Sequence, residues 1–155
     1  MMPLQSAPIA RTGMRIRKPV AEVFNAFVDP AVTRRFWFTR GSGRLEQGAR
    51  VRWTWDMYGV SADVVVRALE VNRRILIEWP TPVEWIFTQR PDGTTYVSII
   101  ASGFTGSDDE KVAQAVDSMG GFSYALAGCK AFLEHGVELR LVADHNPDAH
   151  VEGGA

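Results

Sequence analysis

The order of hydrophobic patterns along the chain constrains its fold more than any other feature. Several consecutive segments carry the patterns of β-strands, and a single long helical pattern follows them. The clearest strand covers residues 51–57, where every second side chain is apolar, and further strands are predicted over 60–71, 75–79, 83–88 and 95–102. Because short turns join these segments, we expect an antiparallel sheet.

A strand and two short helices are predicted ahead of this region. Residues 9–18 form the strand, and Pro19 ends it. The same proline suits the first turn of an amphipathic helix over 19–28, where its missing N–H would be unpaired in any case. Asp29-Pro30 breaks this helix, and a second short helix is expected over 30–36.

The long helix has a clear start and end. Ser107 followed by three acidic residues is typical of a helix N-terminus, and Gly136 is a natural C-terminal cap. Between them, apolar residues recur at three- and four-residue spacing. The Gly120-Gly121 pair interrupts this stripe, and we expect it either to kink the helix or to let another backbone approach.

These elements predict an α+β fold in one domain over residues 9–136. Only one long helix is available to cover the apolar face of the sheet, so a strongly curved antiparallel sheet of about six to seven strands must wrap around it. Residues 1–8 form a short leader. The tail over 137–155 is expected to be partly extended, because Val137, Leu139 and Leu141 alternate, and to be disordered after Pro147.

Four segments carry a resemblance to a known superfamily. They are residues 16–24 (IRKPVAEVF), 36–38 (FWF), 91–104 (PDGTTYVSIIASGF) and 128–136 (GCKAFLEHG). In order and spacing they resemble the START-related, birch-pollen-allergen-like (SRPBCC) superfamily, in its branch similar to the C-terminal domain of the activator of the heat-shock-protein-90 ATPase. The resemblance implies the helix-grip fold and the binding of a small hydrophobic or amphipathic molecule, lipid-like or polyketide-like.

Composition excludes several classes of function. The formal net charge is −1, from 17 basic and 18 acidic residues, so no strong field favours nucleic acid. The one cysteine, Cys129, rules out an intrachain disulfide, and no apolar run is long enough to span a membrane. The N-terminus lacks the pattern of a signal peptide, and we expect a cytoplasmic protein.

Bulky side chains are predicted to line a cavity between the sheet and the long helix. The strands supply the inward rings, the helix supplies four positions, and Trp37 closes the mouth. The candidate ligand-binding residues are Trp37, Trp53, Trp55, Met57, Trp79, Trp85, Phe87, Met119, Phe122, Ser123 and Leu126. The alternative is that these side chains simply fill the core, because aromatic rings close a cavity as readily as they line one.

No catalytic residue, metal site or cofactor is predicted. The three histidines lie at the end of the long helix or in the tail, and their spacing matches no rigid ligand pattern. Cys129 falls on the apolar stripe of the helix, which indicates an inert buried thiol. The strand carboxylates Asp63, Glu70, Glu78 and Glu84 are expected to face solvent, and any one of them inside the cavity would become a candidate acid or base.

Two other functions stay open beside ligand binding. The branch resemblance implies a chaperone ATPase cofactor, but that activator carries a separate N-terminal domain that eight to fifteen leader residues would not hold. Some members of the superfamily are enzymes of the cyclase or dehydratase type, which would need a polar pair inside the cavity. The apolar tail residues Leu139, Leu141 and Val142 further suggest packing on the domain or pairing into a homodimer.

Overall fold

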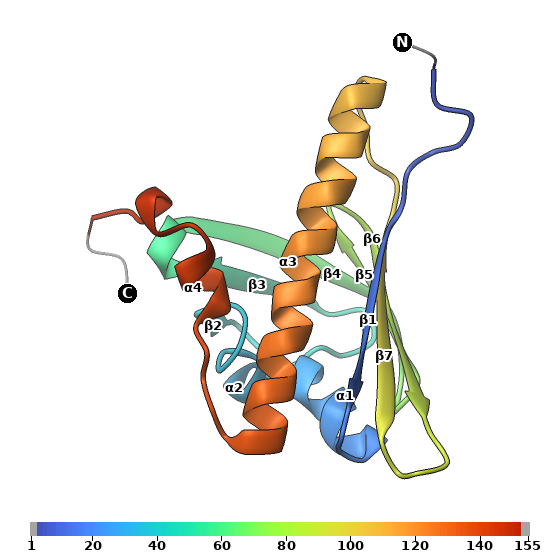
Figure 1. Ribbon diagram of the computed structural model, residues 1–155, viewed down its shortest axis with the longest axis vertical. Coiled ribbons are helices and arrows are strands. Elements are labelled where there is room, and N and C mark those ends of the chain that lie inside the picture. Colours follow the sequence, from blue (N-terminus) through green and yellow to red (C-terminus); the bar gives the residue numbers. More distant parts are fainter. Residues whose placement is uncertain (1–2, 153–155) are drawn as a thin grey trace.

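The computed structural model describes residues 3–152, and its centre is one curled sheet of seven antiparallel strands (Figure 1). The strand order across the sheet is β1-β7-β6-β5-β4-β3-β2. The strands are β1 (Ala10–Ile16), β2 (Arg40–Gly41), β3 (Arg50–Trp55), β4 (Val60–Glu70), β5 (Arg74–Trp79), β6 (Thr81–Gln89) and β7 (Thr95–Ala101). The predicted α+β fold with a curved antiparallel sheet is therefore confirmed.

The helices lie on the concave side and at the lower end of the sheet in Figure 1. Two short helices, α1 (Val20–Val28) and α2 (Pro30–Thr33), follow β1, and the long helix α3 (Asp108–His135) follows β7. A short helix α4 (Leu141–His145) lies beside α3 in the tail. No helix of the described part of the chain is long and apolar enough to cross a membrane.

The predicted ends of α3 are confirmed by its capping bonds. The Ser107 side chain accepts a hydrogen bond from the Glu110 backbone N–H at 3.2 Å, and Gly136 adopts φ +67° while donating to the Phe132 carbonyl at 2.8 Å. Between these caps the helix runs without interruption through Gly120 and Gly121. No described backbone atom meets the helix at these two glycines, so the expected close approach does not occur there.

Polar contacts fix α3 along the edge strand β1. The hydroxyls of Thr12 and Ser123 are 2.7 Å apart. Further along, Lys130 donates to the Arg15 carbonyl at 3.0 Å, and Glu134 accepts from the Arg17 backbone N–H at 2.8 Å. These bonds occupy backbone groups of the β1 edge and place the helix on one side of the sheet.

The two faces of the sheet differ as their sequence alternation predicts. The concave face holds the buried apolar residues, among them Val64, Ile77 and Val97, which are fully buried. The opposite face carries ion pairs between neighbouring strands, such as Arg52–Asp63 at 3.3 Å and Arg67–Glu78 at 2.9 Å. The seven-stranded sheet therefore has a single apolar face that the rest of the chain must cover.

The tail, which was expected to be partly extended, contains a short helix. Residues 137–140 form no regular element, and Leu141 begins α4. Beyond Pro147, where disorder was expected, a 3-10 turn η2 (Pro147–Ala149) leads to Val151, whose backbone N–H donates to the Met57 carbonyl at 2.9 Å. Residues 153–155 lie outside the described part. Leu139 is 45% exposed, and pairing into a homodimer stays a prediction that light scattering can test.

We expect substitution of Gly128 by alanine to destabilise the protein. An added Cβ at Gly128 would lie 2.9 Å from the backbone oxygen of Phe36, so either α3 or the loop must move. Gly128→Ala should lower the free energy of unfolding by about 1–3 kcal/mol in urea denaturation. The matched control is Gly120→Ala, because a Cβ added at Gly120 has no atom within 4 Å. This substitution should raise the free energy of unfolding by about 0.5–1 kcal/mol.

Candidate ligand-binding groove

Trp37 is the hub of an aromatic cluster under α3. It follows α2, and its backbone N–H donates to the Thr33 carbonyl at 3.0 Å. Its ring centroid lies between 5.0 and 6.1 Å from six other aromatic rings. These rings belong to Phe38, Trp53, Trp55, Trp79, Trp85 and Phe122. Trp37 thus fills the space that the sequence analysis assigned to a cavity mouth.

The deep interior behind Trp37 is packed. Trp53 is 2% exposed and Trp85 is 1% exposed. The indole N–H of Trp85 has no hydrogen-bond acceptor among the described residues, which fits surroundings made of rings and aliphatic side chains. For the deep part of the predicted cavity, the core-filling alternative therefore describes the structure.

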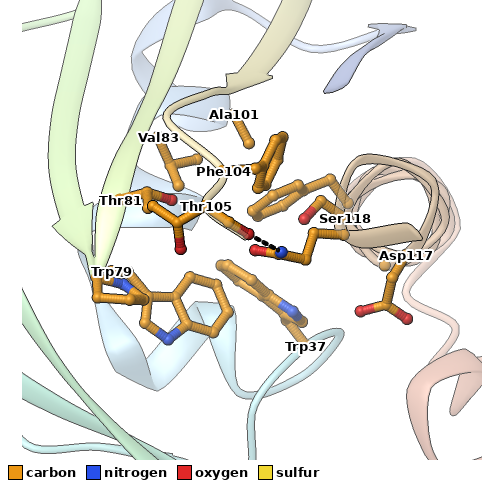
Figure 2. Close-up of a pocket in the computed structure, with 13 residues that line it drawn as sticks. Trp37, Trp79, Thr81, Val83, Ala101, Phe104, Thr105, Asp117 and Ser118 are labelled. Atoms are coloured by element: carbon orange, nitrogen blue, oxygen red, sulfur yellow. Dashed lines mark hydrogen bonds between the residues drawn. The ribbon is translucent and has the colours of Figure 1, made fainter. Parts of the chain in front are cut away.

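Two open hollows remain on either side of Trp37 and Trp79. The first, the β7-side hollow, has a volume of about 340 Å³ and is lined by Val83, Ala101, Phe104, Thr105 and Gln114 among others (Figure 2). The second, the α4-side hollow, has a volume of about 700 Å³. It is lined by Trp55, Tyr58, Ser61, Tyr124, Val142 and His145 among others.

The two hollows are neighbours and share part of their lining, which we call the central section. Trp37, Trp79, Asp117 and Gly121 line both of them, and we call their union the groove. The Trp37 and Trp79 rings stand 5.8 Å apart at 66° and divide it. Trp79 also stacks on Trp55, with centroids 5.4 Å apart and an interplanar angle of 9°. The groove therefore presents indole surface on both sides of its divider.

The C-terminal tail builds one wall of the α4-side hollow. The Tyr58 hydroxyl donates to the Val142 carbonyl, and a ring nitrogen of His150 lies 2.8 Å from the Ala143 carbonyl oxygen. The rings of Tyr124 and His145 are 4.6 Å apart, which joins α3 to α4. The tail therefore belongs to the groove, although the sequence analysis placed no ligand-binding residue there.

Comparison with protein families identifies the chain. Residues 17–134 match the family described as Activator of Hsp90 ATPase homolog 1-like protein. The chain belongs to this family. The predicted resemblance to this branch of the SRPBCC superfamily is confirmed. No curated protein gives a match to the chain.

Solved structures agree with the family assignment. A crystal structure of protein SSP2350 from Staphylococcus saprophyticus is 30% identical, with a TM-score of 0.77, covering 86% of this chain and 96% of that one. The Aha1 dimer from Colwellia psychrerythraea is 15% identical, with a TM-score of 0.72, covering 83% and 98%. DynU16, described as a putative protein in the dynemicin biosynthetic locus, is 22% identical, with a TM-score of 0.72, covering 84% and 48%.

Within this family member, the predicted site residues form two groups: five line at least one of three hollows, and six line none of them. Trp37, Trp55, Trp79 and Phe122 line the groove. Met57 lines a third hollow of about 320 Å³ between the loop after α2 and the tail. The other predicted residues, which line none of these three hollows, are Trp53, Trp85, Phe87, Met119, Ser123 and Leu126.

Three residues of this second group face away from the groove, in directions that sequence periodicity did not show. Met119 lies on the outer side of α3 and is 50% exposed. Ser123 faces β1, where its hydroxyl meets Thr12. Phe87 packs edge-on against Phe24 of α1, with centroids 5.2 Å apart. The helical stripe was correctly found, but the edge position of α3 turns part of it away from the groove.

Sequence reasoning missed Asp117 and Gly121. Both line the central section of the groove, yet neither stands out in a search for apolar stripes. Asp117 follows Val116 on the helix and reads as an ordinary solvated residue. The available signal was the glycine pair at 120–121, since glycine inside a long helix is unfavourable unless packing or function requires the space.

The groove carries no reactive thiol and no cluster of metal ligands. Cys129 is a fully buried residue of α3, and burial raises the pKa of its thiol far above the ordinary value. Within residues 3–152, no three His, Cys, Asp or Glu side chains converge as a metal site would require. The groove therefore provides apolar and aromatic contacts to a ligand, with a few polar groups at its rim.

We expect removal of the Trp37 ring to destabilise the protein strongly. Trp37→Ala deletes the common partner of six rings and opens a void between the two hollows, so the free energy of unfolding should fall by about 3–5 kcal/mol. Val116, which is largely exposed on α3, provides the control. Val116→Ala should change the free energy of unfolding by less than about 0.5 kcal/mol. A loss below about 1 kcal/mol for Trp37→Ala would show that the cluster does not depend on this ring.

Proposed function

We propose that the protein binds a small hydrophobic or amphipathic molecule in the groove. The observation that carries this proposal is the shared central section, where Trp37 and Trp79 present their rings to both hollows. A flat apolar molecule laid against these rings would remove indole surface from water on both sides. Stacking on aromatic faces is favourable beyond simple area burial.

The size of the groove suits such a ligand. The hollows of about 340 and 700 Å³ fall in the range of pockets that hold drug-sized molecules. Polar groups at the rim, among them Gln114 and Ser61, could orient a ligand without filling the space. Gln114 is already held by the Thr105 carbonyl at 2.7 Å, so this rim is ordered before any ligand arrives (Figure 2).

The comparisons offer modest support for a role with small molecules. DynU16 shares the fold, and its description places it in a biosynthetic locus. A polyketide-like ligand is therefore included in the proposal. A lipid-like ligand is the other class that the apolar lining can accept.

The family description favours a second candidate, which is stimulation of a chaperone ATPase through a protein–protein contact. An ATPase assay with the Hsp90-type chaperone and this chain alone distinguishes the two. Stimulation that persists in a groove-blocking variant would favour the second candidate over ligand binding. The groove leads us to rank ligand binding first.

We expect a side chain at position 121 to block ligand binding without harming the fold. A Cβ built on Gly121 meets nothing within 4 Å and would enter the open groove, so Gly121→Leu should weaken binding of the neutral probe naphthalenemethanol at least about tenfold in calorimetry. The free energy of unfolding should rise, because leucine has the higher helix propensity.

The neighbouring glycine supplies the matched control. A Cβ added at Gly120 would also meet open space, but Gly120 lines neither hollow. Gly120→Leu should therefore leave the affinity for the probe unchanged while raising stability by a similar amount. Equal affinities in the Gly121→Leu and Gly120→Leu variants, or no binding to the native chain, would contradict the proposed site.

A further inference from the structure

We infer that the groove selects ligands that carry a protonated amine over ligands that carry a carboxylate. This inference rests on the proposed function and names the chemical class of its ligand. It starts from the charges around the groove. Asp117 is the one carboxylate that lines the groove, it lines both hollows, and no lysine or arginine of the described residues lines either of them.

Asp117 is available to a ligand. It belongs to α3 and lies beside Trp37 in the close-up of the β7-side hollow (Figure 2). No described lysine, arginine or histidine pairs with its carboxylate. By contrast, Asp108 on the same helix accepts a bond from the Leu4 backbone N–H at 3.0 Å. A ligand ammonium group at the central section would therefore meet an unengaged carboxylate.

The aromatic lining points to the same ligand charge. The faces of indole and phenol rings carry negative potential and attract cations such as ammonium groups. Trp37, Trp55 and Trp79 line the α4-side hollow together with Tyr58 and Tyr124. A carboxylate placed among these rings would lose hydration and gain no lysine or arginine partner from the described lining, where His145 is the one basic side chain.

The cationic side chains near Trp37 lie outside the groove. Arg34, Arg35 and Arg140 line the third hollow, on the side where the tail crosses the loop after α2. Arg35 is paired there with Glu138 at 3.4 Å. The first turn of α3 adds further negative charge with Asp109 and Glu110. The charged lysine, arginine, aspartate and glutamate side chains in the lining of the groove are therefore limited to Asp117.

A set of three probes with one ring system tests the inference. Naphthylmethylamine, naphthalenemethanol and naphthoate carry an ammonium, a hydroxyl and a carboxylate, and calorimetry at about pH 8 keeps free histidine neutral. We expect the amine to bind about tenfold more tightly than the alcohol, and the carboxylate to bind more weakly than the alcohol. Asp117→Asn should lower the ratio of amine affinity to alcohol affinity to about one.

A control variant at a second acidic residue of α3 distinguishes direct contact of the ligand with Asp117 from the effect of negative charge elsewhere on the helix. Asp109 is exposed and lines neither hollow, so Asp109→Asn makes the same charge change and should keep the preference for the amine. If the alcohol binds and Gly121→Leu blocks it, but the native chain does not prefer the amine, the inference is overturned and the proposed function stands. Loss of the preference in both aspartate variants alike also overturns it. If none of the probes binds, the proposed function itself fails.

Discussion

The mismatch between one helix and seven strands governs the structure. A helix with its side chains is about 10–12 Å wide, whereas seven strands spaced about 4.8 Å apart span roughly 29 Å when flat. Curling shortens that span but does not remove it. Hydrogen bonds that involve Ser123, Lys130 and Glu134 hold α3 along β1. The concave face over β3 to β5 must therefore be covered by something other than the helix.

Trp37 and the tail provide that cover, and both leave gaps. A ring inserted from the loop after α2 can fill the deep part of the concave face, and its six aromatic partners show how completely it does so. The remaining space lies where α3, the Trp37–Trp79 pair and α4 meet, which is the groove.

The sequence was sufficient for the fold class because local patterns determined its long elements, although β2 and α4 were not predicted. Strand alternation, the Ser107 cap and the Gly136 terminus all describe short-range physics, and the structure agrees with them. The site depends on long-range placement, which these patterns do not contain. The apolar stripe of the helix predicted that both Phe122 and Met119 line the cavity. In the structure, α3 lies at the sheet edge, where Phe122 is buried and Met119 is exposed. Asp117 lines the groove because of where α3 lies on the sheet, which no local pattern indicates.

The glycine pair shows how the groove and the fold are balanced. Glycine inside a helix costs about 1 kcal/mol relative to alanine, and α3 contains two in succession without a kink or a neighbouring backbone that would require them. At Gly121 the missing side chain has a spatial consequence, because any Cβ-bearing residue would project into the central section of the groove. A chain selected for stability alone would fill this position. The glycine at position 121 therefore keeps the central section of the groove open.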